Sequence, residues 1–198
     1  MNQLRHVIFT GPDEVRARFK DRYKTGLVSE VAKLRPRNGS DPILYTTLVT
    51  MRGLARRIEM LNPEVRDLDR MLTELVNDTA PSLVALYGAG VDTAASLLVA
   101  AGDNPDRIGT EASWAHLCGV TPIPASSGKT TRYRLNRGGD RQANAALYRI
   151  VLTRMSSDPR TRDYVQRRRT EGLSNREIMR CLKRYIARET FKHLPRTA

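Results

Sequence analysis

Residues 44–75 read LYTTLVTMRGLARRIEMLNPEVRDLDRMLTEL, and this stretch decides the fold. Its apolar side chains recur at alternating steps of four and three, an a/d heptad pattern held over about four heptads. They are Leu44, Leu48, Met51, Leu54, Ile58, Leu61, Val65, Leu68, Leu72 and Leu75. The pattern predicts a long helix. Two interpretations stay open: a coiled coil with another copy, or the face of a helical hairpin within the chain. Pro63 is the one flaw, because proline either kinks a helix or divides it.

Short helices are predicted before this segment. Residues 1–35 have the pattern of one or two amphipathic helices, and Pro12-Asp13-Glu14 is typical of a helix start that places Val15 and Phe19 on one face. Residues 35–40, RPRNGS, have the composition of a linker. We therefore expect connector helices over 1–40 and the coiled-coil segment over 41–79.

A glycine turn opens the rest of the chain. Residues 81–101 contain two helical runs around YGAGVDT at 87–93. A short G-x-G turn between helices resembles a helix-hairpin-helix, in which backbone N–H groups bind a DNA phosphate. Gly88, Gly90 and Thr93 are then candidate nucleic-acid contacts. An ordinary tight connection between two helices explains the turn as well.

Further helices are predicted over 111–118, over 141–155, from 158 to a stop at Gly172, and from Asn175 to about Leu194. Ser174 and Glu177 form a capping box for the last of these. Trp114 is expected in the core, with stacking on a base as the alternative. The last helix has an apolar face of Ile178, Cys181, Leu182, Tyr185 and Ile186. The fold class is therefore mostly α, with a long coiled-coil or hairpin segment followed by a compact helical domain over 80–198.

Charge is distributed unevenly along the chain. The whole chain has 34 Lys and Arg against 21 Asp and Glu, and residues 129–198 hold 19 basic but only 6 acidic residues. Such asymmetry indicates a polyanionic partner, and the predominance of arginine suits phosphate groups. Nucleic acid is the favoured partner. A membrane surface is the weaker interpretation, since the basic helices carry few aromatic anchors.

Composition argues against several classes. No apolar run is long enough to span a membrane, and the N-terminal apolar stretch is too short for a signal peptide. Cys118 and Cys181 lack metal-ligand spacing and are expected to be buried thiols in a reducing compartment. His6, His116 and His193 are scattered. We therefore expect no metal site, and a cytoplasmic protein.

The candidate chemistry lies in residues 119–144, GVTPIPASSGKTTRYRLNRGGDRQAN. A small-residue turn carries Ser126 and Ser127 and is followed by cations. A serine among cations is what attack on a phosphodiester needs, because the cations neutralise charge that develops on the phosphoryl oxygens. A solvated basic loop explains the same residues. The candidate nucleic-acid contacts here and in the later helices are Lys129, Arg132, Arg134, Arg137, Arg141, Arg180 and Arg184.

The order of these motifs resembles a known family. The segments are ALYGAGVDTAASLLVAAGDNPDRI at 85–108, WAHLCGVTPIPASSG at 114–128, RYRLNRGGDRQANAAL at 132–147 and REIMRCLKRYIARE at 176–189. Together they resemble the C-terminal half of bacterial insertion-sequence transposases of the serine type, whose members have an N-terminal RuvC-like domain and are guided by a bridge RNA.

The resemblance implies a DNA transposase or recombinase, associated with the bacterial nucleoid, that assembles as a homo-oligomer through residues 44–75. The family's Pro-x-x-x-Ser turn falls on Pro122 and Ser126, so Ser126 is the implied nucleophile and Ser127 the fallback. It also implies a structured guide RNA, and four acidic residues of the RuvC-like domain that bind a divalent metal such as Mg²⁺. Residues 1–40 show no matching pattern, so we expect a truncated, degenerate or split copy in which this chain alone is inactive. A non-catalytic nucleic-acid-binding or regulatory remnant is the alternative.

Overall fold

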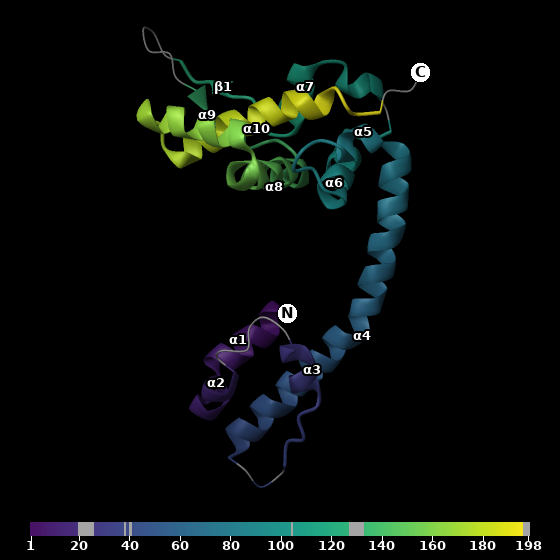
Figure 1. Cartoon of the computed structure of the whole chain (residues 1–198), viewed down its shortest axis with the longest axis vertical. Helices are drawn as coiled ribbons and strands as arrows, with labels where there is room; N and C mark the ends of the chain where they lie inside the picture. Colours follow the sequence, from purple (N-terminus) through teal and green to yellow (C-terminus); the bar gives the residue numbers. More distant parts are fainter. Residues whose placement is uncertain (20–25, 38, 40, 104, 127–132, 196–198) are drawn as a thin grey trace. The chain divides into compact units, whose positions relative to one another are not determined.

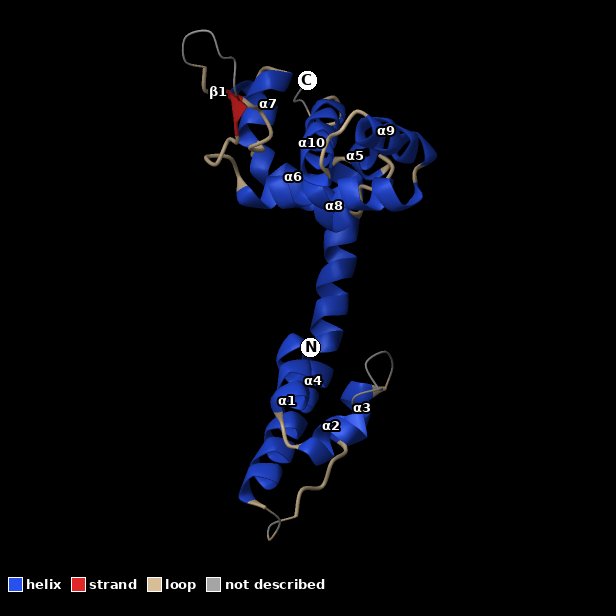
Figure 2. Cartoon of the chain, turned by 90° about the vertical axis from the view of Figure 1, so that its left-hand side faces the viewer, coloured by secondary structure: helices blue, strands red, loops and turns tan. Residues whose placement is uncertain are grey.

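The structure is a computed structural model that describes residues 1–19, 26–37, 39, 41–103, 105–126 and 133–195. The described residues divide into two compact units, Met1–Arg70 and Met71–Ala198, here called the N-terminal and C-terminal units. Helices make up nearly all of both (Figure 2), which confirms the expected mostly α fold. Among the residues that the structure describes there is one short strand pair, which was not expected from the sequence.

The N-terminal unit packs three short helices against the first part of a long one. These are α1 (Asn2–Thr10), α2 (Asp13–Phe19), α3 (Leu27–Ala32) and α4 (Pro42–Thr79). As predicted, α2 begins at Asp13 and buries Val15 and Phe19. Their neighbours in the core include Leu4, Ile8 and Met51. This region therefore holds three short helices, where one or two were expected.

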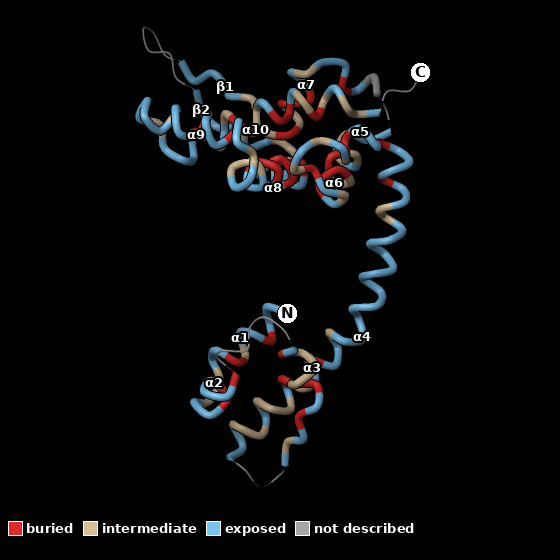
Figure 3. The backbone as a smooth tube through the Cα atoms, viewed as in Figure 1, coloured by how far each residue is buried: buried red, intermediate tan, exposed pale blue. Residues whose placement is uncertain are grey.

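Helix α4 contains the heptad pattern, and the seam is covered in its first half and largely exposed in its second. The helix is 38 residues long and continues through Pro63, so the proline does not divide it. Leu44, Leu48, Leu54 and Ile58 pack against the N-terminal core, as the hairpin interpretation predicts for this half. Residues 59–71 are all exposed (Figure 3). Exposed seam positions include Leu61, Val65, Leu68 and Leu75.

The C-terminal unit is a bundle around a single large core. Its elements are α5 (Pro81–Val84), α6 (Val91–Ala101), η1 (Pro105–Ile108), α7 (Glu111–Leu117), β1 (Ile123–Pro124), β2 (Tyr133–Arg134), α8 (Arg141–Ser157), α9 (Pro159–Thr170) and α10 (Asn175–Phe191). Helix α8 packs against α6, α9 and α10 (Figure 1). Strands β1 and β2 are antiparallel, with Ile123 opposite Arg134 and Pro124 opposite Tyr133.

Polar side chains fix where these helices begin. The side chain of Asp140 accepts a hydrogen bond from the Ala143 N–H at 2.7 Å, and that of Asp158 accepts one from the Thr161 N–H at 3.1 Å. Such N-caps satisfy N–H groups that have no partner inside the helix. The predicted capping box of Ser174 and Glu177 is present. The sequence therefore placed the starts of the three basic helices correctly.

Two predictions about aromatic residues have opposite outcomes. Trp114 is completely buried and its indole N–H donates to Thr190 Oγ1 at 3.1 Å, so its role is in the core and stacking on a base is ruled out. Tyr185 was expected on the apolar face of the last helix with Ile178 and Ile186, which are buried. That placement was wrong, because the side chain of Tyr185 is 52% exposed.

Candidate nucleic-acid interface

Gly119 and Gly139, which flank the segment that carries Ser126, are in close backbone contact. Gly119 and Gly139 lie so near each other that a Cβ built on Gly139 falls within 3.0 Å of Gly119 backbone atoms and 2.8 Å from Leu117 O. Nearby, the Asp140 N–H donates to Leu117 O at 2.6 Å and Asn136 Nδ2 donates to His116 O at 3.0 Å. We call this crossing the neck. Gly139 thus supplies a packing contact that only glycine fits.

Ser126 lies beyond the neck. It is exposed and follows β1 by two residues, in irregular backbone. Pro122, four residues earlier in the predicted turn, lines a groove described below. Ser127, Lys129 and Arg132 lie outside the described residues, so their predicted roles stay predictions.

A groove lies between the β1–β2 region and one face of α10. Its volume is about 410 Å³, within the range of about 300–1,000 Å³ typical of ligand sites. The cationic residues that line it are Arg134, Arg180, Lys183, Arg184 and Arg188, and the apolar or aromatic ones include Val120, Tyr133, Leu135 and Tyr185. We call this the α10 groove. It brings together three of the predicted nucleic-acid contacts, Arg134, Arg180 and Arg184.

One carboxylate pairs with two of these cations. Glu111 Oε1 lies 3.3 Å from Arg184 Nη1 and accepts a hydrogen bond from Arg188 Nε at 2.8 Å. Within the described residues, Thr121 Oγ1 is a buried polar atom without a hydrogen bond, and Thr121 lines the groove. A buried polar atom without a partner costs about 1–3 kcal/mol. A polar ligand in the groove would relieve that cost.

Lys183 links the groove to a neighbouring cavity. Its Nζ donates to Asn144 Oδ1 at 2.9 Å, and Asn144 Nδ2 donates to Cys118 O at 2.8 Å. Burial, and then the positive charge of Arg180, lower the pKa of the Lys183 ammonium. The neighbouring α8 cavity, of about 340 Å³, is also lined by Lys183, together with Arg137, Arg141 and Tyr148. Arg137 and Arg141, two further candidate contacts, therefore lie beside the groove residues, and their contact with nucleic acid stays a prediction.

The glycine turn of the expected helix-hairpin-helix lies elsewhere. Helix α5 before it is only four residues long. A Cβ on Gly88 would lie 3.4 Å from Ile150 O, so this glycine packs against α8. Thr93 is buried and its hydroxyl donates to Gly90 O at 2.7 Å. Gly88, Gly90 and Thr93 line neither the groove nor the α8 cavity, and their contact with phosphate stays a prediction.

The other candidate reactive groups are accounted for. Cys118 is buried, and burial together with the Asp140 carboxylate raises the pKa of its thiol to about 12, which keeps it protonated and unreactive. Among the described residues, no group of three or more His, Cys, Asp and Glu side chains is placed to hold a metal ion. No described helix combines the length and apolar character needed to cross a membrane.

Sequence reasoning missed some of the groove. Lys183 and Arg188 were not among the candidate nucleic-acid contacts, and Tyr133 and Leu135 had no predicted role. Two signals were available. Arg180, Arg184 and Arg188 recur every four residues, which places them on one helix face, and RYRL at 132–135 alternates as a strand does.

These features define a basic helical domain with a cationic, partly aromatic groove. Residues 81–166 of it match a family model described as "Transposase IS116/IS110/IS902 family". The chain is 30% identical over 134 residues to "Insertion element IS110 uncharacterized 43.6 kDa protein" of Streptomyces coelicolor, which covers 66% of this chain and 33% of the relative. It is 29% identical over 134 residues to "Insertion element IS900 uncharacterized 42 kDa protein" of Mycobacterium paratuberculosis, with 66% and 34% covered. The chain thus spans about a third of the length of these curated relatives. The predicted likeness to insertion-sequence transposases is confirmed at this level.

Proposed function

We propose that this chain is the nucleic-acid-binding and nucleophile-bearing part of an insertion-element transposase. The observation that carries the proposal is the match of residues 81–166 to a transposase family over a region in which Pro122 lines a groove with five cationic side chains. DNA is the expected partner, because transposition acts on DNA and because arginine forks bind phosphate oxygens. The guide RNA that the resemblance implies would use the same cationic surface.

In the proposed reaction the Ser126 hydroxyl oxygen attacks the phosphorus of a DNA phosphodiester. A bond forms between Oγ and phosphorus, the bond from phosphorus to one sugar oxygen breaks, and that oxygen takes up a proton. The product is a phosphoserine link and a free DNA end. Arg134, on the strand that pairs with the one before Ser126, and Arg180 would balance the negative charge of the phosphoryl oxygens.

The serine hydroxyl must also lose its proton. No histidine lies near Ser126 in the sequence, and an alkyl hydroxyl is a weak nucleophile near neutral pH. In the family that the chain resembles, Mg²⁺ held by the RuvC-like domain would supply this activation. This chain's own part is then to present the hydroxyl and to hold the phosphate.

The test is a covalent protein–DNA adduct on a denaturing gel, with labelled substrate DNA and the RuvC-like domain supplied by fusion or in trans. Ser126→Ala should abolish the adduct while DNA binding survives, and Ser127→Ala should retain it. Ser157→Ala is the matched control, because Ser157 is an exposed serine of α8 whose hydroxyl only donates to Thr153 O. An adduct that persists without both Ser126 and Ser127 removes serine chemistry from this segment.

A non-catalytic nucleic-acid-binding or regulatory role is the second candidate. It is favoured by the α10 groove, whose five cations can bind phosphates whether or not Ser126 reacts. The same assay separates the two candidates. Binding of DNA with no adduct in any of these preparations is the result expected for the non-catalytic role.

We also propose that the exposed part of the α4 seam pairs with a second copy. Leu61, Val65, Leu68 and Leu75 are exposed along this part of the helix, and such a stripe is buried in a coiled coil. Ile58, by contrast, packs within the N-terminal unit. A charge at Leu68 therefore tests assembly, whereas a charge at Ile58 tests the folding of that unit.

A further inference from the structure

We infer that the α10 groove binds an unpaired nucleotide, with its base stacked on Tyr133 or Tyr185 and its phosphates held by the arginines of α10. The inference rests on the proposed nucleic-acid partner but not on serine chemistry. It names the form of nucleic acid that the groove accepts, a strand whose bases are free to leave the stack.

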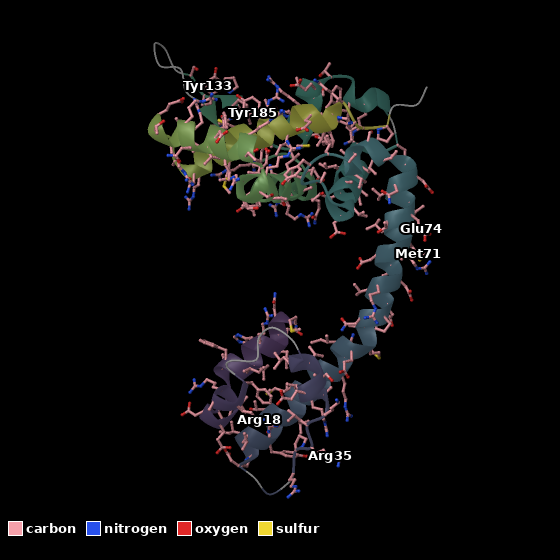
Figure 4. All side chains as sticks on the ribbon, viewed as in Figure 1. Arg18, Arg35, Met71, Glu74, Tyr133 and Tyr185 are labelled. Atoms are coloured by element: carbon pink, nitrogen blue, oxygen red, sulfur yellow. The ribbon has the colours of Figure 1, made fainter. Side chains whose placement is uncertain are left out.

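Two exposed tyrosine side chains line the groove. Tyr133 on β2 and Tyr185 on α10 come from different elements, line the same groove, and have side chains that are 64% and 52% exposed. Figure 4 labels both at the same end of the C-terminal unit. Leu135 adds an exposed apolar side chain to the lining. Exposed aromatic faces beside cations are what single-stranded nucleic-acid sites have in common, because every base has a face that can stack.

One of these tyrosines is held in place. Tyr185 makes an edge-to-face contact with Tyr164 of α9, with ring centroids 5.8 Å apart and an interplanar angle of 90°. This contact leaves Tyr185 half exposed. A ring positioned in advance loses less entropy when a base stacks on it.

Arginine side chains of α10 line the groove as well. Arg180, Arg184 and Arg188 lie on one face of α10 at steps of about 6 Å, beside the aromatic side chains. Arg180 is not ion-paired at close range within the described residues, although its charge, after the capping-box hydrogen bonds, acts on the Glu177 carboxylate of the same helix and lowers the pKa of that group. Glu111 pairs with Arg184 and Arg188 together, so the groove keeps excess positive charge. Phosphates need these cations, and the buried Thr121 hydroxyl of the groove lining, which has no hydrogen bond, can donate to one of them.

The shape of the groove favours an unpaired strand over a duplex. In a duplex the base faces are covered by neighbouring pairs, so Tyr133 and Tyr185 could reach only base edges or the backbone. A concave site of about 410 Å³ with apolar and cationic lining matches a flipped or single-stranded nucleotide, which offers a base face and a phosphate together.

The experiment measures binding of four labelled probes to the full chain by fluorescence anisotropy at one fixed low salt concentration. The probes are a thymidine oligomer of about eight nucleotides, the uridine oligomer of the same length, an abasic oligomer with the same phosphates, and a matched duplex. We expect the strand with bases to bind at least about fivefold more tightly than the abasic strand, because each stacked base contributes a factor of about 5 to 150. The DNA and RNA oligomers distinguish the source of the nucleotide.

Substitutions then locate the stacking. At least one of Tyr133→Ala and Tyr185→Ala should weaken binding of the strand with bases at least about fivefold and leave binding of the abasic strand unchanged, and that variant identifies the ring on which the base stacks. Tyr133→Phe and Tyr185→Phe keep the ring and should keep the affinity. Phe9→Ala is the control, because Phe9 is an exposed aromatic residue of the N-terminal unit. Trp114 fluorescence confirms that the C-terminal unit, which contains the groove, is folded in each variant.

The outcomes separate this inference from the proposed function. If no probe binds, both fail. If the duplex binds and the unpaired strands do not, the inference fails and DNA binding stands. Equal affinity for strands with and without bases, or full affinity in both alanine variants, also overturns the inference.

Discussion

Gly139→Ala tests whether the neck positions the candidate interface. An added Cβ would lie 2.8 Å from Leu117 O and closer still to Gly119 backbone atoms. The tightest contacts, with Gly119 Cα and N, would be 2.3 Å, whereas ordinary carbon contacts need about 3.5–4.0 Å, so the two backbone segments must separate by about 1.2 Å or more. Neither segment can yield by turning a side chain, because the atoms in the way belong to the backbone. The substitution therefore strains the base of the segment that carries Ser126.

The expected cost follows from the contacts at the neck. Overpacking of a well-packed site costs about 1–3 kcal/mol. Separation also weakens the hydrogen bonds from Asp140 N–H to Leu117 O and from Asn144 Nδ2 to Cys118 O, each of which contributes about 1 kcal/mol. We expect the free energy of unfolding of the C-terminal unit to fall by about 2–4 kcal/mol. With a urea m-value near 2 kcal/mol/M, the midpoint moves down by about 1–2 M.

The chain provides both the probe and the control. Trp114 is its only tryptophan and is buried in the C-terminal unit, so its fluorescence in a urea titration reports on that unit alone. Gly138→Ala is the matched control, because its Cβ would meet only Asn136 Oδ1, at 3.6 Å, an ordinary contact. We expect that variant to change stability by less than about 1 kcal/mol. Equal midpoints for the two alanine variants would refute the close contact on which this reasoning depends.

Three further outcomes are expected. The log affinity of the chain for duplex DNA should fall with log salt at about 0.9 per phosphate neutralised, and a flat dependence in a gel-shift titration would contradict the basic interface. Leu68→Lys, at a seam position that is 63% exposed, should lower the molar mass in light scattering without changing the unfolding midpoint, whereas a wild-type chain that is already monomeric would contradict pairing through α4. Hydrogen bonds, first from the Thr161 hydroxyl, lower the pKa of Asp158, so its charge stabilises the folded state above the unfolded pKa of about 3.9 and this contribution is lost as the pH falls through the folded pKa. Asp158→Asn should therefore lower the melting temperature at pH 7 by no more than about 4 °C, an effect of under about 1 kcal/mol, and the gap to the wild type should narrow as the pH falls below the unfolded pKa; a gap independent of pH would disprove the charge effect.

Local patterns predicted the helices because their causes are local. Asp140, Asp158 and Ser174 cap helices through contacts three residues away, and such contacts can be inferred from spacing alone. The heptad pattern of 44–75 likewise gave one long helix. It could not say which half of that helix is covered, because the N-terminal core that receives Leu48 and Ile58 is formed by residues distant in sequence.

The candidate site depends on contacts that spacing does not reveal. The cations of the basic C-terminal third were predicted as a set, yet only the fold shows that Arg134 and Arg180 line one groove while Arg137 and Arg141 line the cavity beside it. The wrong placement of Tyr185 has the same origin. Its spacing fits the apolar face of α10, but the ring meets Tyr164 of α9 in an edge-to-face contact and stays half exposed.

The neck positions both the α10 groove and Ser126. Gly119 ends the segment after α7 and Gly139 precedes α8, and their contact brings β1 and β2 out from one place on the bundle. Strand β2 carries Tyr133 and Arg134 into the α10 groove, while β1 leads to Ser126. A change at the neck should therefore weaken nucleotide binding in the groove and adduct formation at Ser126 together. A Gly139→Ala variant that loses one of these activities and keeps the other would show that the groove and the serine are positioned independently.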